Sequence, residues 1–228
     1  MIVKIGNWIF KYRNIIFPFF YAALFIPSPG ILPEKYALII GALIIAFGIL
    51  VRSITIGLEY IIRGGYKGKI HAKKLVTGGI YSVCRNPMYL GNISLILGFG
   101  FFANSLLFLL LFFPLFVFIY HCIIKAEEKF LTGKFGDEYV EYKTKVNALL
   151  PHPGNIRGAF QGYQFNWKRV MVKEYNSLYT YFIGILLLLL YKGTFGIYTF
   201  LIIGGALTVV YVTIKIIKKV NKLGKMDR

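Results

Sequence analysis

The sequence predicts an all-α polytopic membrane protein with about six transmembrane helices. Hydrophobic residues make up 57% of the 228 residues and the mean hydropathy is +0.64, far too apolar for an ordinary soluble domain. Six apolar runs approach the roughly 20 residues that a spanning helix needs. They are Ile15–Ile26, Tyr36–Ile56, Leu90–Ala103, Leu106–Ile124, Leu178–Tyr191 and Phe195–Ile217.

The distribution of positive charge predicts how these helices are oriented. The chain carries 27 Lys and Arg against 9 Asp and Glu, a formal net charge of +18. Lys35 and Lys192 fall in loops on one face of the predicted bundle, Arg52 lies within a span, and all other Lys and Arg fall on the opposite face. Because Lys and Arg accumulate in cytoplasmic loops, we expect both termini to be cytoplasmic. This accounts for the charge without a nucleic-acid partner.

Taken in order, the runs divide the chain into three parts. Residues 1–74 contain two spans, joined by the turn-forming sequence P-S-P-G-I-L-P, and a basic, glycine-rich cytoplasmic loop. Residues 75–151 contain a helical hairpin, whose turn at Asn104-Ser105 is so short that its helices must be antiparallel neighbours. Residues 152–228 contain a basic and aromatic linker, a second helix pair and a polybasic tail.

The N-terminal segment and the small number of cysteines indicate the membrane in which the protein is expected to reside. The N-terminus lacks the small-residue pattern of a cleavable signal peptide, so it is expected to stay attached. Cys84 and Cys122 are the chain's two cysteines and are predicted to be free thiols. These features favour the inner membrane of a prokaryote.

Two features inside the predicted spans are each open to two interpretations. The second span is expected to continue past Glu59, which puts Arg52 and Glu59 on one face, and such charges are costly unless they face a cavity or each other. They form either a polar pocket wall or side chains that snorkel to the headgroups. Three glycines in the hairpin permit close approach of either another helix or a flat ligand. They are Gly91, Gly98 and Gly100.

The stretch Leu75–Gly91, L-V-T-G-G-I-Y-S-V-C-R-N-P-M-Y-L-G, is the most distinctive part of the sequence. Asn86 is predicted to be the N-cap of the third span, with Pro87 as its first helical residue. The corner would then offer backbone N–H groups and a positive dipole end to an anion, and Arg85 would add a charged fork. The competing interpretation is a basic boundary marker, since Arg and Tyr commonly anchor membrane helices.

The returning helix of the hairpin ends in an acidic, amphipathic segment. Glu127 and Glu128 are consecutive, so they point about 100° apart and only one is expected to face a given pocket. This places acids next to the Arg85 corner, where a ligand with a positive and a negative end would fit. Beyond them, four side chains recur at helical spacing and are expected to lie against the membrane or over the base of the hairpin. They are Phe135, Tyr139, Tyr142 and Val146.

Two motifs together closely resemble the isoprenylcysteine carboxyl methyltransferase and phospholipid methyltransferase family of integral membrane enzymes. They are the Leu75–Gly91 stretch and the segment E-E-K-F-L-T-G-K-F-G-D-E-Y-V-E-Y-K-T-K-V-N-A-L-L-P, which follows after one hairpin. The resemblance implies a cytoplasm-facing pocket for S-adenosyl-L-methionine, formed by the hairpin and the amphipathic helix after it, and a lipid or lipophilic acceptor. The cofactor-binding residues that it implies are Lys74, Leu75, Val76, Tyr81, Arg85, Asn86, Pro87, Met88, Tyr89 and Glu127.

The chemistry of that cofactor agrees with these positions. Its carboxylate suits the helix N-terminus at Asn86–Met88, and its amino group suits Glu127. Its sulfonium suits an aromatic face such as that of Tyr81 or Tyr89. Methyl transfer is an in-line displacement, so the protein mainly has to position donor and acceptor.

The catalytic residues and the acceptor stay open. A carboxylate acceptor needs no general base, whereas an amine acceptor needs one, for which Glu128 is the candidate, with Arg85 as a second possible catalytic residue. Asn86 stands where the family more usually has histidine. Ile123 stands where prenylcysteine enzymes carry an arginine for the substrate carboxylate, a role that would fall to Lys125 or Arg52.

Two other functions are compatible with the sequence. Membrane sterol reductases resemble this family in the same region but bind NADPH, whose phosphates would use Arg85 and the basic loop, although the tandem acids oppose a polyphosphate. A non-enzymatic membrane scaffold would keep the fold without the chemistry, although the motif residues are intact. No metal site is expected because His71 lacks nearby partners, and the oligomeric state is left open.

Overall fold

The computed structural model describes residues 1–59 and 70–220, which form helices and turns with no strand among them. The chain divides into two compact units, Met1–Gln164 and Phe165–Arg228. Residues 63–69 of the predicted basic loop and 221–228 of the polybasic tail lie outside the described residues.

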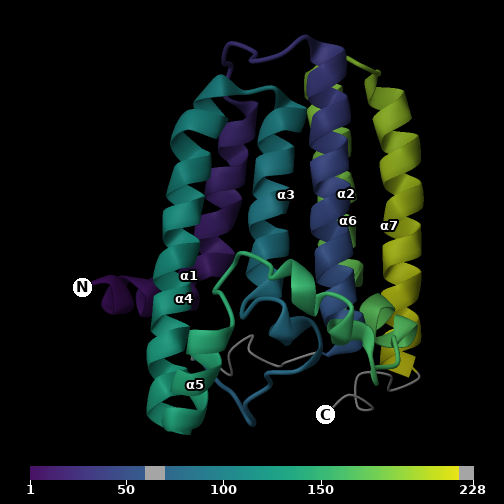
Figure 1. Ribbon diagram of the computed structural model, residues 1–228. Coiled ribbons are helices and arrows are strands. Elements are labelled where there is room, and N and C mark those ends of the chain that lie inside the picture. Colours follow the sequence, from purple (N-terminus) through teal and green to yellow (C-terminus); the bar gives the residue numbers. More distant parts are fainter. Residues whose placement is uncertain (60–69, 221–228) are drawn as a thin grey trace. The chain divides into compact units, whose positions relative to one another are not determined.

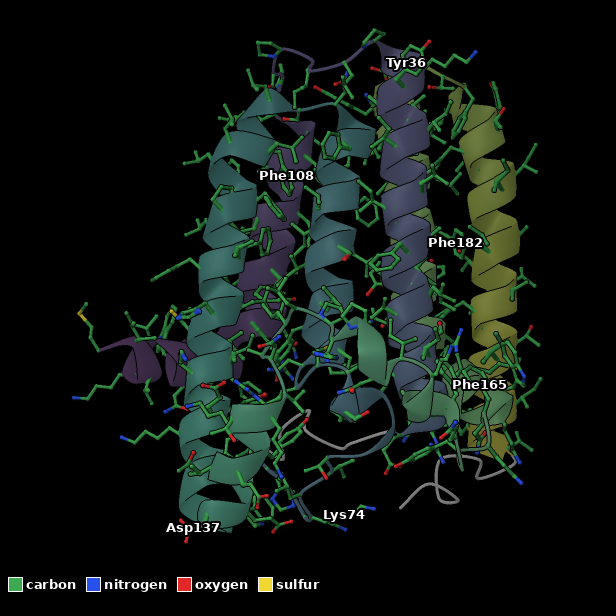
Figure 2. The ribbon with its side chains drawn as sticks, viewed as in Figure 1. Tyr36, Lys74, Phe108, Asp137, Phe165 and Phe182 are labelled. Atoms are coloured by element: carbon green, nitrogen blue, oxygen red, sulfur yellow. The ribbon has the colours of Figure 1, made fainter. Side chains whose placement is uncertain are left out.

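The first unit is a bundle of four long helices. Figure 1 shows them side by side, with the α1–α2 and α3–α4 connections at one end and α5 at the other. Figure 2 shows Tyr36 at the first of these ends and Lys74 and Asp137 at the second. The four long helices are α1 (Ile2–Ala22), α2 (Glu34–Leu58), α3 (Pro87–Ala103) and α4 (Phe113–Phe135). A π-helical turn at Phe108–Phe112 precedes α4, and the short helix α5 (Asp137–Lys145) follows it.

The second unit is a helix pair, α6 (Trp167–Tyr191) and α7 (Ile197–Val220), as the sequence predicts. The rings of α6 Tyr179 and α7 Tyr211 stack with centroids 4.4 Å apart. Helix α6 begins well before its apolar run, because the Asn166 side chain caps it by accepting a hydrogen bond from the backbone of Arg169 at 2.8 Å. Part of the predicted linker is therefore helical.

Three helices of the described chain are long and apolar enough to cross a membrane: Glu34–Leu58, Phe108–Phe135 and Ile197–Val220. The chain is therefore an integral membrane protein. Helix α3 is apolar but shorter, and α1 and α6 carry Lys and Arg in their first halves. Each predicted run overlaps a helix, while the count of six spans stays a prediction. Helix α2 ends at Leu58, so the prediction that it continues past Glu59 is wrong.

Helices α2 and α3 are in close contact through glycines. A Cβ at Gly98 would lie 2.7 Å from the backbone N of Ile45, and one at Gly91 would lie 2.6 Å from Cγ of Arg52. Gly100 faces side chains at the start of the returning helix instead. Of the two interpretations of these glycines, close approach of protein segments is the one that the structure shows.

Asn104 joins the two connections at one end of the first unit. Its backbone is left-handed, with φ of 52°. Its Oδ1 accepts hydrogen bonds from the backbone N–H of Ile31 at 2.9 Å and Leu32 at 3.2 Å, and its Nδ2 donates to the Leu32 carbonyl at 2.8 Å. The hairpin turn and the Pro-rich turn are thus held together, which leaves the opposite end to carry the candidate site.

Candidate functional site

The entry to α3 has the predicted form, with Asn86 at the N-cap position and Pro87 as the first helical residue. The Asn86 side chain does not cap the helix, because its Nδ2 donates to the carbonyl of Ala148 at 3.1 Å. The backbone N–H groups of Arg85 and Asn86 donate to the carbonyls of Asn147 at 2.9 Å and Ala148 at 3.1 Å. The sequence predicts that the backbone N–H groups of this corner face an anion. In the structure, those of Arg85 and Asn86 bind the segment after α5 instead.

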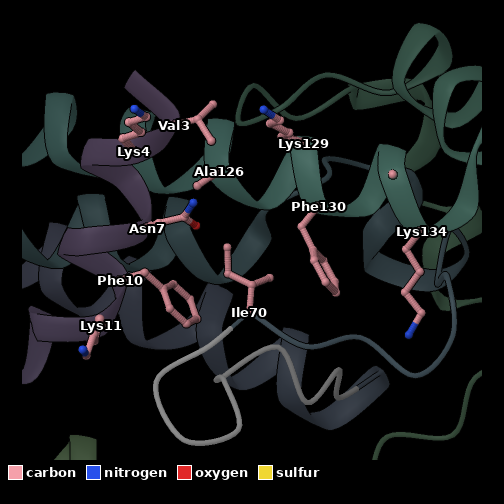
Figure 3. A pocket seen from close by; sticks show the side chains of 11 residues that line it. Val3, Lys4, Asn7, Phe10, Lys11, Ile70, Ala126, Lys129, Phe130 and Lys134 are labelled. Carbon is pink, nitrogen blue, oxygen red and sulfur yellow. The ribbon is translucent and has the colours of Figure 1, made fainter. Parts of the chain in front are cut away.

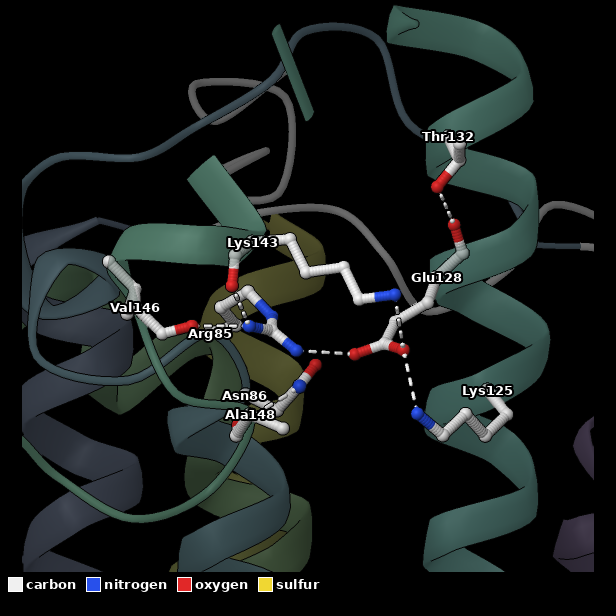
Figure 4. Close-up of polar contacts among 8 residues, drawn as sticks. All are labelled: Arg85, Asn86, Lys125, Glu128, Thr132, Lys143, Val146 and Ala148. Carbon is white, nitrogen blue, oxygen red and sulfur yellow. Dashed lines mark hydrogen bonds and ion pairs between the residues drawn. The ribbon is translucent and has the colours of Figure 1, made fainter. Parts of the chain in front are cut away.

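The Arg85 guanidinium is also engaged within the protein, as Figure 4 shows. Its Nη2 donates to Oε1 of Glu128 at 2.6 Å. Its Nη1 donates to the carbonyls of Lys143, at 2.9 Å, and Val146. Since Arg85 is 6% exposed, these bonds hold α4 and the end of α5 against the corner.

Glu128 is buried and lies among three cations. Besides Arg85, its Oε2 lies 3.2 Å from Nζ of Lys125 and 3.6 Å from Nζ of Lys143. The carboxylate is 4% exposed, and burying a charge is costly unless it is paired and hydrogen-bonded. These partners meet that requirement, so the geometry gives Glu128 the role of holding Arg85 in place.

Glu127 faces different surroundings from Glu128, as their helical spacing predicts. Its Oε1 accepts a hydrogen bond from the hydroxyl of Tyr89 at 2.7 Å, and the residue is 2% exposed. The Tyr89 ring packs against a core cluster between α1 and α4 and lies 5.3 Å from the Tyr120 ring, centroid to centroid. The cluster consists of Ile9, Phe10, Ile119, Cys122 and Ile123. A carboxylate and a phenol are thus held together in an apolar environment.

The remaining predicted cofactor residues precede α3. Tyr81 is buried in a 3₁₀ turn, Gly79–Ser82, and its carbonyl accepts a hydrogen bond from the Tyr142 hydroxyl at 2.6 Å. Val76 is buried, and Leu75 packs against a cluster that contains Tyr142. The other members are Ala72, Leu131, Tyr139 and Val146. The aromatic stripe therefore folds over the base of the hairpin, the second of the two predicted placements.

Lys74 and Glu59 lie at the edge of this region. Their side chains are 77% and 23% exposed, and Nζ of Lys74 lies 3.7 Å from Oε1 of Glu59. Arg52 is 8% exposed and donates to Oδ1 of Asn92 on α3. Arg52 thus faces the protein interior. Sequence reasoning missed Asn92, although an amide inside an apolar helix is itself a signal, because such groups need a partner there.

Two other predicted positions also have clear surroundings. Ile123 is 1% exposed in the α1–α4 core cluster, so an apolar contact stands where prenylcysteine enzymes carry arginine. Lys125, a predicted substitute for that arginine, is held by Glu128. Within residues 1–59 and 70–220, no group of three His, Cys, Asp or Glu side chains is placed to hold a metal ion.

Residues 36–138, from the start of α2 to α5, match the phospholipid methyltransferase family. Over these residues the chain is similar to that family. The matched segment contains the Arg85–Glu128 and Tyr89–Glu127 pairs, and the match confirms the resemblance found in the motifs.

The chain is also similar to curated proteins with two kinds of name, methyltransferases and a metal-resistance protein. The chain is 38% identical over 81 residues to protein-S-isoprenylcysteine O-methyltransferase of Schizosaccharomyces pombe, covering 34% of this chain and 33% of the relative. It is 30% identical over 125 residues to the protein of the same name in Saccharomyces cerevisiae, covering 53% and 51%. It is 37% identical over 84 residues to the cobalt-zinc-cadmium resistance protein CzcN of Cupriavidus metallidurans, covering 37% and 38%. The matches thus span between a third and a half of these relatives, and no solved structure matches the chain.

Proposed function

We propose that this protein is an S-adenosylmethionine-dependent methyltransferase that acts on a membrane-embedded or amphipathic acceptor at the cytoplasmic interface. The observation that carries the proposal is the hydrogen-bonded pair of half-buried Tyr89 and buried Glu127 inside the matched segment. Two relatives named protein-S-isoprenylcysteine O-methyltransferase support the same reaction class. Six spans with both termini in the cytoplasm are part of the proposal, because they place this pair at the cytoplasmic end of the bundle.

The residues present fit the amino end of the cofactor. When bound, S-adenosylmethionine supplies an electrophilic methyl group on a positively charged sulfur. Glu127 offers a buried carboxylate to the amino group, and the Tyr89 hydroxyl orients that carboxylate. Tyr81 and Tyr89 are the aromatic candidates for the sulfonium.

The carboxylate end of the cofactor is assigned to a different group from the one that the sequence alone favours. Arg85 already binds Glu128 and two carbonyls, so we assign it to positioning the α3 entry. Lys74 keeps an exposed ammonium group, and its contact with Glu59 at 3.7 Å is partly solvated. Such exposed ion pairs are weak, so Lys74 is available to a carboxylate on the ligand.

The chain contributes to the transfer step mainly by positioning. Glu127 is buried and Tyr89 is half-buried against the α1–α4 core cluster, which limits water around this pair, and the Arg85–Glu128 pair fixes the helices that carry them. Because Glu128 is held by three cations, we do not assign it to proton transfer. An acceptor that needs no base, such as an isoprenylcysteine-like carboxylate, fits this arrangement, and a phospholipid-like amine is the second acceptor class.

The test is direct titration of the full chain in detergent with S-adenosylmethionine and, separately, with NADPH. We expect saturable binding of the methyl donor, and we expect Glu127→Gln to weaken it at least tenfold, since a charged hydrogen bond contributes about 1.5–3 kcal/mol. Tyr89→Phe should weaken it less, because the carboxylate stays.

Glu141→Gln is the matched control, because it removes an exposed carboxylate that pairs with Lys145. Its affinity for the methyl donor should equal that of the unmodified chain. Binding of NADPH without binding of S-adenosylmethionine would overturn the proposal in favour of a reductase. Equal affinity of Glu127→Gln and Glu141→Gln would overturn the site assignment.

A further inference from the structure

The first unit contains a pocket whose described lining residues come from α1, α4 and Ile70. It has a volume of about 910 Å³ and lies between the first turns of α1 and the last turns of α4. Figure 3 shows Lys4, Asn7 and Phe10 of α1 on one side and Lys129 and Phe130 of α4 on the other. Neither Tyr89 nor Glu127 is among its described lining residues, so the pocket is separate from the candidate cofactor site.

Positive charge dominates the polar lining of this pocket. Four of the described lining residues are lysines, and none of the described lining residues is acidic. The lysines come from two helices, Lys4 and Lys11 from α1 and Lys129 and Lys134 from α4. Lys134 donates to the carbonyl of Ala72, and Lys11 lies over the Tyr12 ring. Because no carboxylate of the described lining balances these lysines, the complementary occupant is an anion.

The rest of the lining is largely apolar. Phe10 is 3% exposed and belongs to the α1–α4 core cluster, against which Ile70 also packs. Val3, Ala126 and Phe130 add further apolar surface. A cavity of this size exceeds what a simple inorganic anion needs and is in the range of pockets for organic ligands. The occupant that fits has an anionic head and an apolar tail.

The position of α1 indicates where such an occupant comes from. Its first residues, M-I-V-K-I-G-N-W-I-F-K-Y-R, combine three basic residues with apolar and aromatic side chains, as in helices that lie at a membrane surface. Gly6 brings this segment so close to α4 that a Cβ there would lie 2.0 Å from the Cys122 carbonyl oxygen. This contact fixes α1 against α4 beside the pocket, and a basic, apolar segment of this kind is expected at the level of lipid headgroups.

We propose that this pocket binds one anionic lipid of the surrounding bilayer, with the headgroup phosphate among the lysines and the start of an acyl chain against Phe10 and Phe130. The described lining includes neither Tyr89 nor Glu127, and the proposal does not depend on the proposed methyl transfer. The occupant is a lipid with net negative charge, because the lining offers cations and no described counter-charge to a zwitterionic headgroup.

The experiment is calorimetric titration of the full chain in a non-ionic maltoside detergent with three probes. These are short-chain phosphatidylglycerol, short-chain phosphatidylcholine and inorganic phosphate. We expect one saturable site for phosphatidylglycerol and at least tenfold weaker binding of phosphatidylcholine. Inorganic phosphate that binds as tightly as phosphatidylglycerol would overturn the lipid assignment in favour of a free anion.

Two pairs of variants test the location of the site. Replacing both Lys4 and Lys129 by Gln should weaken phosphatidylglycerol binding roughly 20-fold, since each basic residue near an anionic lipid contributes about fivefold. Replacing Lys215 and Lys219 of α7 by Gln removes the same formal charge elsewhere and should leave the affinity unchanged. An equal loss in both double variants would overturn the site in favour of unspecific charge attraction.

The second pair of variants keeps every lysine and changes only the free volume of the pocket. Gly133 lines the pocket, and a Cβ built there meets nothing within 4 Å, so Gly133→Trp is accommodated by filling the cavity. It should abolish phosphatidylglycerol binding, whereas Gly133→Ala should keep it. Unchanged binding to a folded Gly133→Trp chain, with folding checked by circular dichroism and gel filtration, would overturn the proposal.

Discussion

Two neighbouring carboxylates on α4 have different surroundings although they are the same residue type. Glu127 accepts a hydrogen bond from a phenol in an apolar cluster, and Glu128 is surrounded by three cations. The difference follows from the helical turn between them, which directs Glu127 toward α3 and Glu128 toward the segment around α5. One residue is thus suited to a ligand and the other to holding the fold.

Removing the charge of Glu128 should destabilise the protein. Glu128→Gln leaves the buried Arg85 guanidinium without its carboxylate partner, and breaking a buried ion pair in this way costs about 3–5 kcal/mol. The measurement is the free energy of unfolding in detergent. Glu141→Gln, which breaks an exposed pair, is the control and should show no measurable change; similar losses in both variants would contradict the structural role of Glu128.

The Cys84 thiol should be nearly unreactive in the folded protein. Burial raises its pKa to about 11, an effect that the hydrogen bond from the Asn86 backbone partly offsets. Because the thiolate is the reactive form, about one thiol in a thousand is reactive at pH 8. We expect slow labelling by iodoacetamide that accelerates as the pH rises toward 11, and rapid labelling after unfolding. Fast labelling of native Cys84 at pH 8, located by peptide mass spectrometry, would contradict this.

At the scale of elements, the close contact between α2 and α3 depends on residues without side chains. Gly98→Ala would place a Cβ 2.7 Å from the Ile45 backbone N, so the helices must separate, and such overpacking costs about 1–3 kcal/mol. Gly133→Ala is the matched control within another helix, where the Cβ meets open space. It should be neutral or stabilise by up to about 1 kcal/mol, because alanine is the better helix former. Opposite signs of the two changes in unfolding free energy are the expected result.

The boundary between α4 and α5 is also set locally. Gly136 has φ of 56°, which separates the two helices in a region that the sequence reads as one amphipathic segment. The bend lets Tyr139, Tyr142 and Val146 reach the base of the hairpin. It also brings the carbonyls of Lys143 and Val146 to Arg85.

At the scale of the whole molecule, six spans require both predicted outer loops to face the same side of the membrane. Cysteines placed at Lys35 and Lys192 should react with an impermeant maleimide in intact cells, whereas one at Glu141 should react only after permeabilisation. The native thiols add little background because both are buried. Labelling of Lys35→Cys and Lys192→Cys from opposite sides would contradict the six-span topology.

The sequence by itself determined where the elements lie and what kind of protein they form. The apolar runs located the helices, because each span must satisfy its backbone within its own segment. Asn86-Pro87 located the start of α3, because proline suits the first helical position, although the Asn86 side chain itself bonds to Ala148. The paired motifs indicated the family, which the match over residues 36–138 confirms. These are properties of residues close together in the chain.

Only the tertiary structure decided which groups are free to act. The sequence predicted that Arg85 would bind an anion, but in the structure Arg85 binds Glu128 and two carbonyls that are distant in sequence. Glu59 does not share a helical face with Arg52, because α2 ends at Leu58. The lysine pocket likewise joins the first turns of α1 to the last turns of α4. Such pairings depend on how helices far apart in sequence pack against one another. The periodicity of a single helix does not determine that packing.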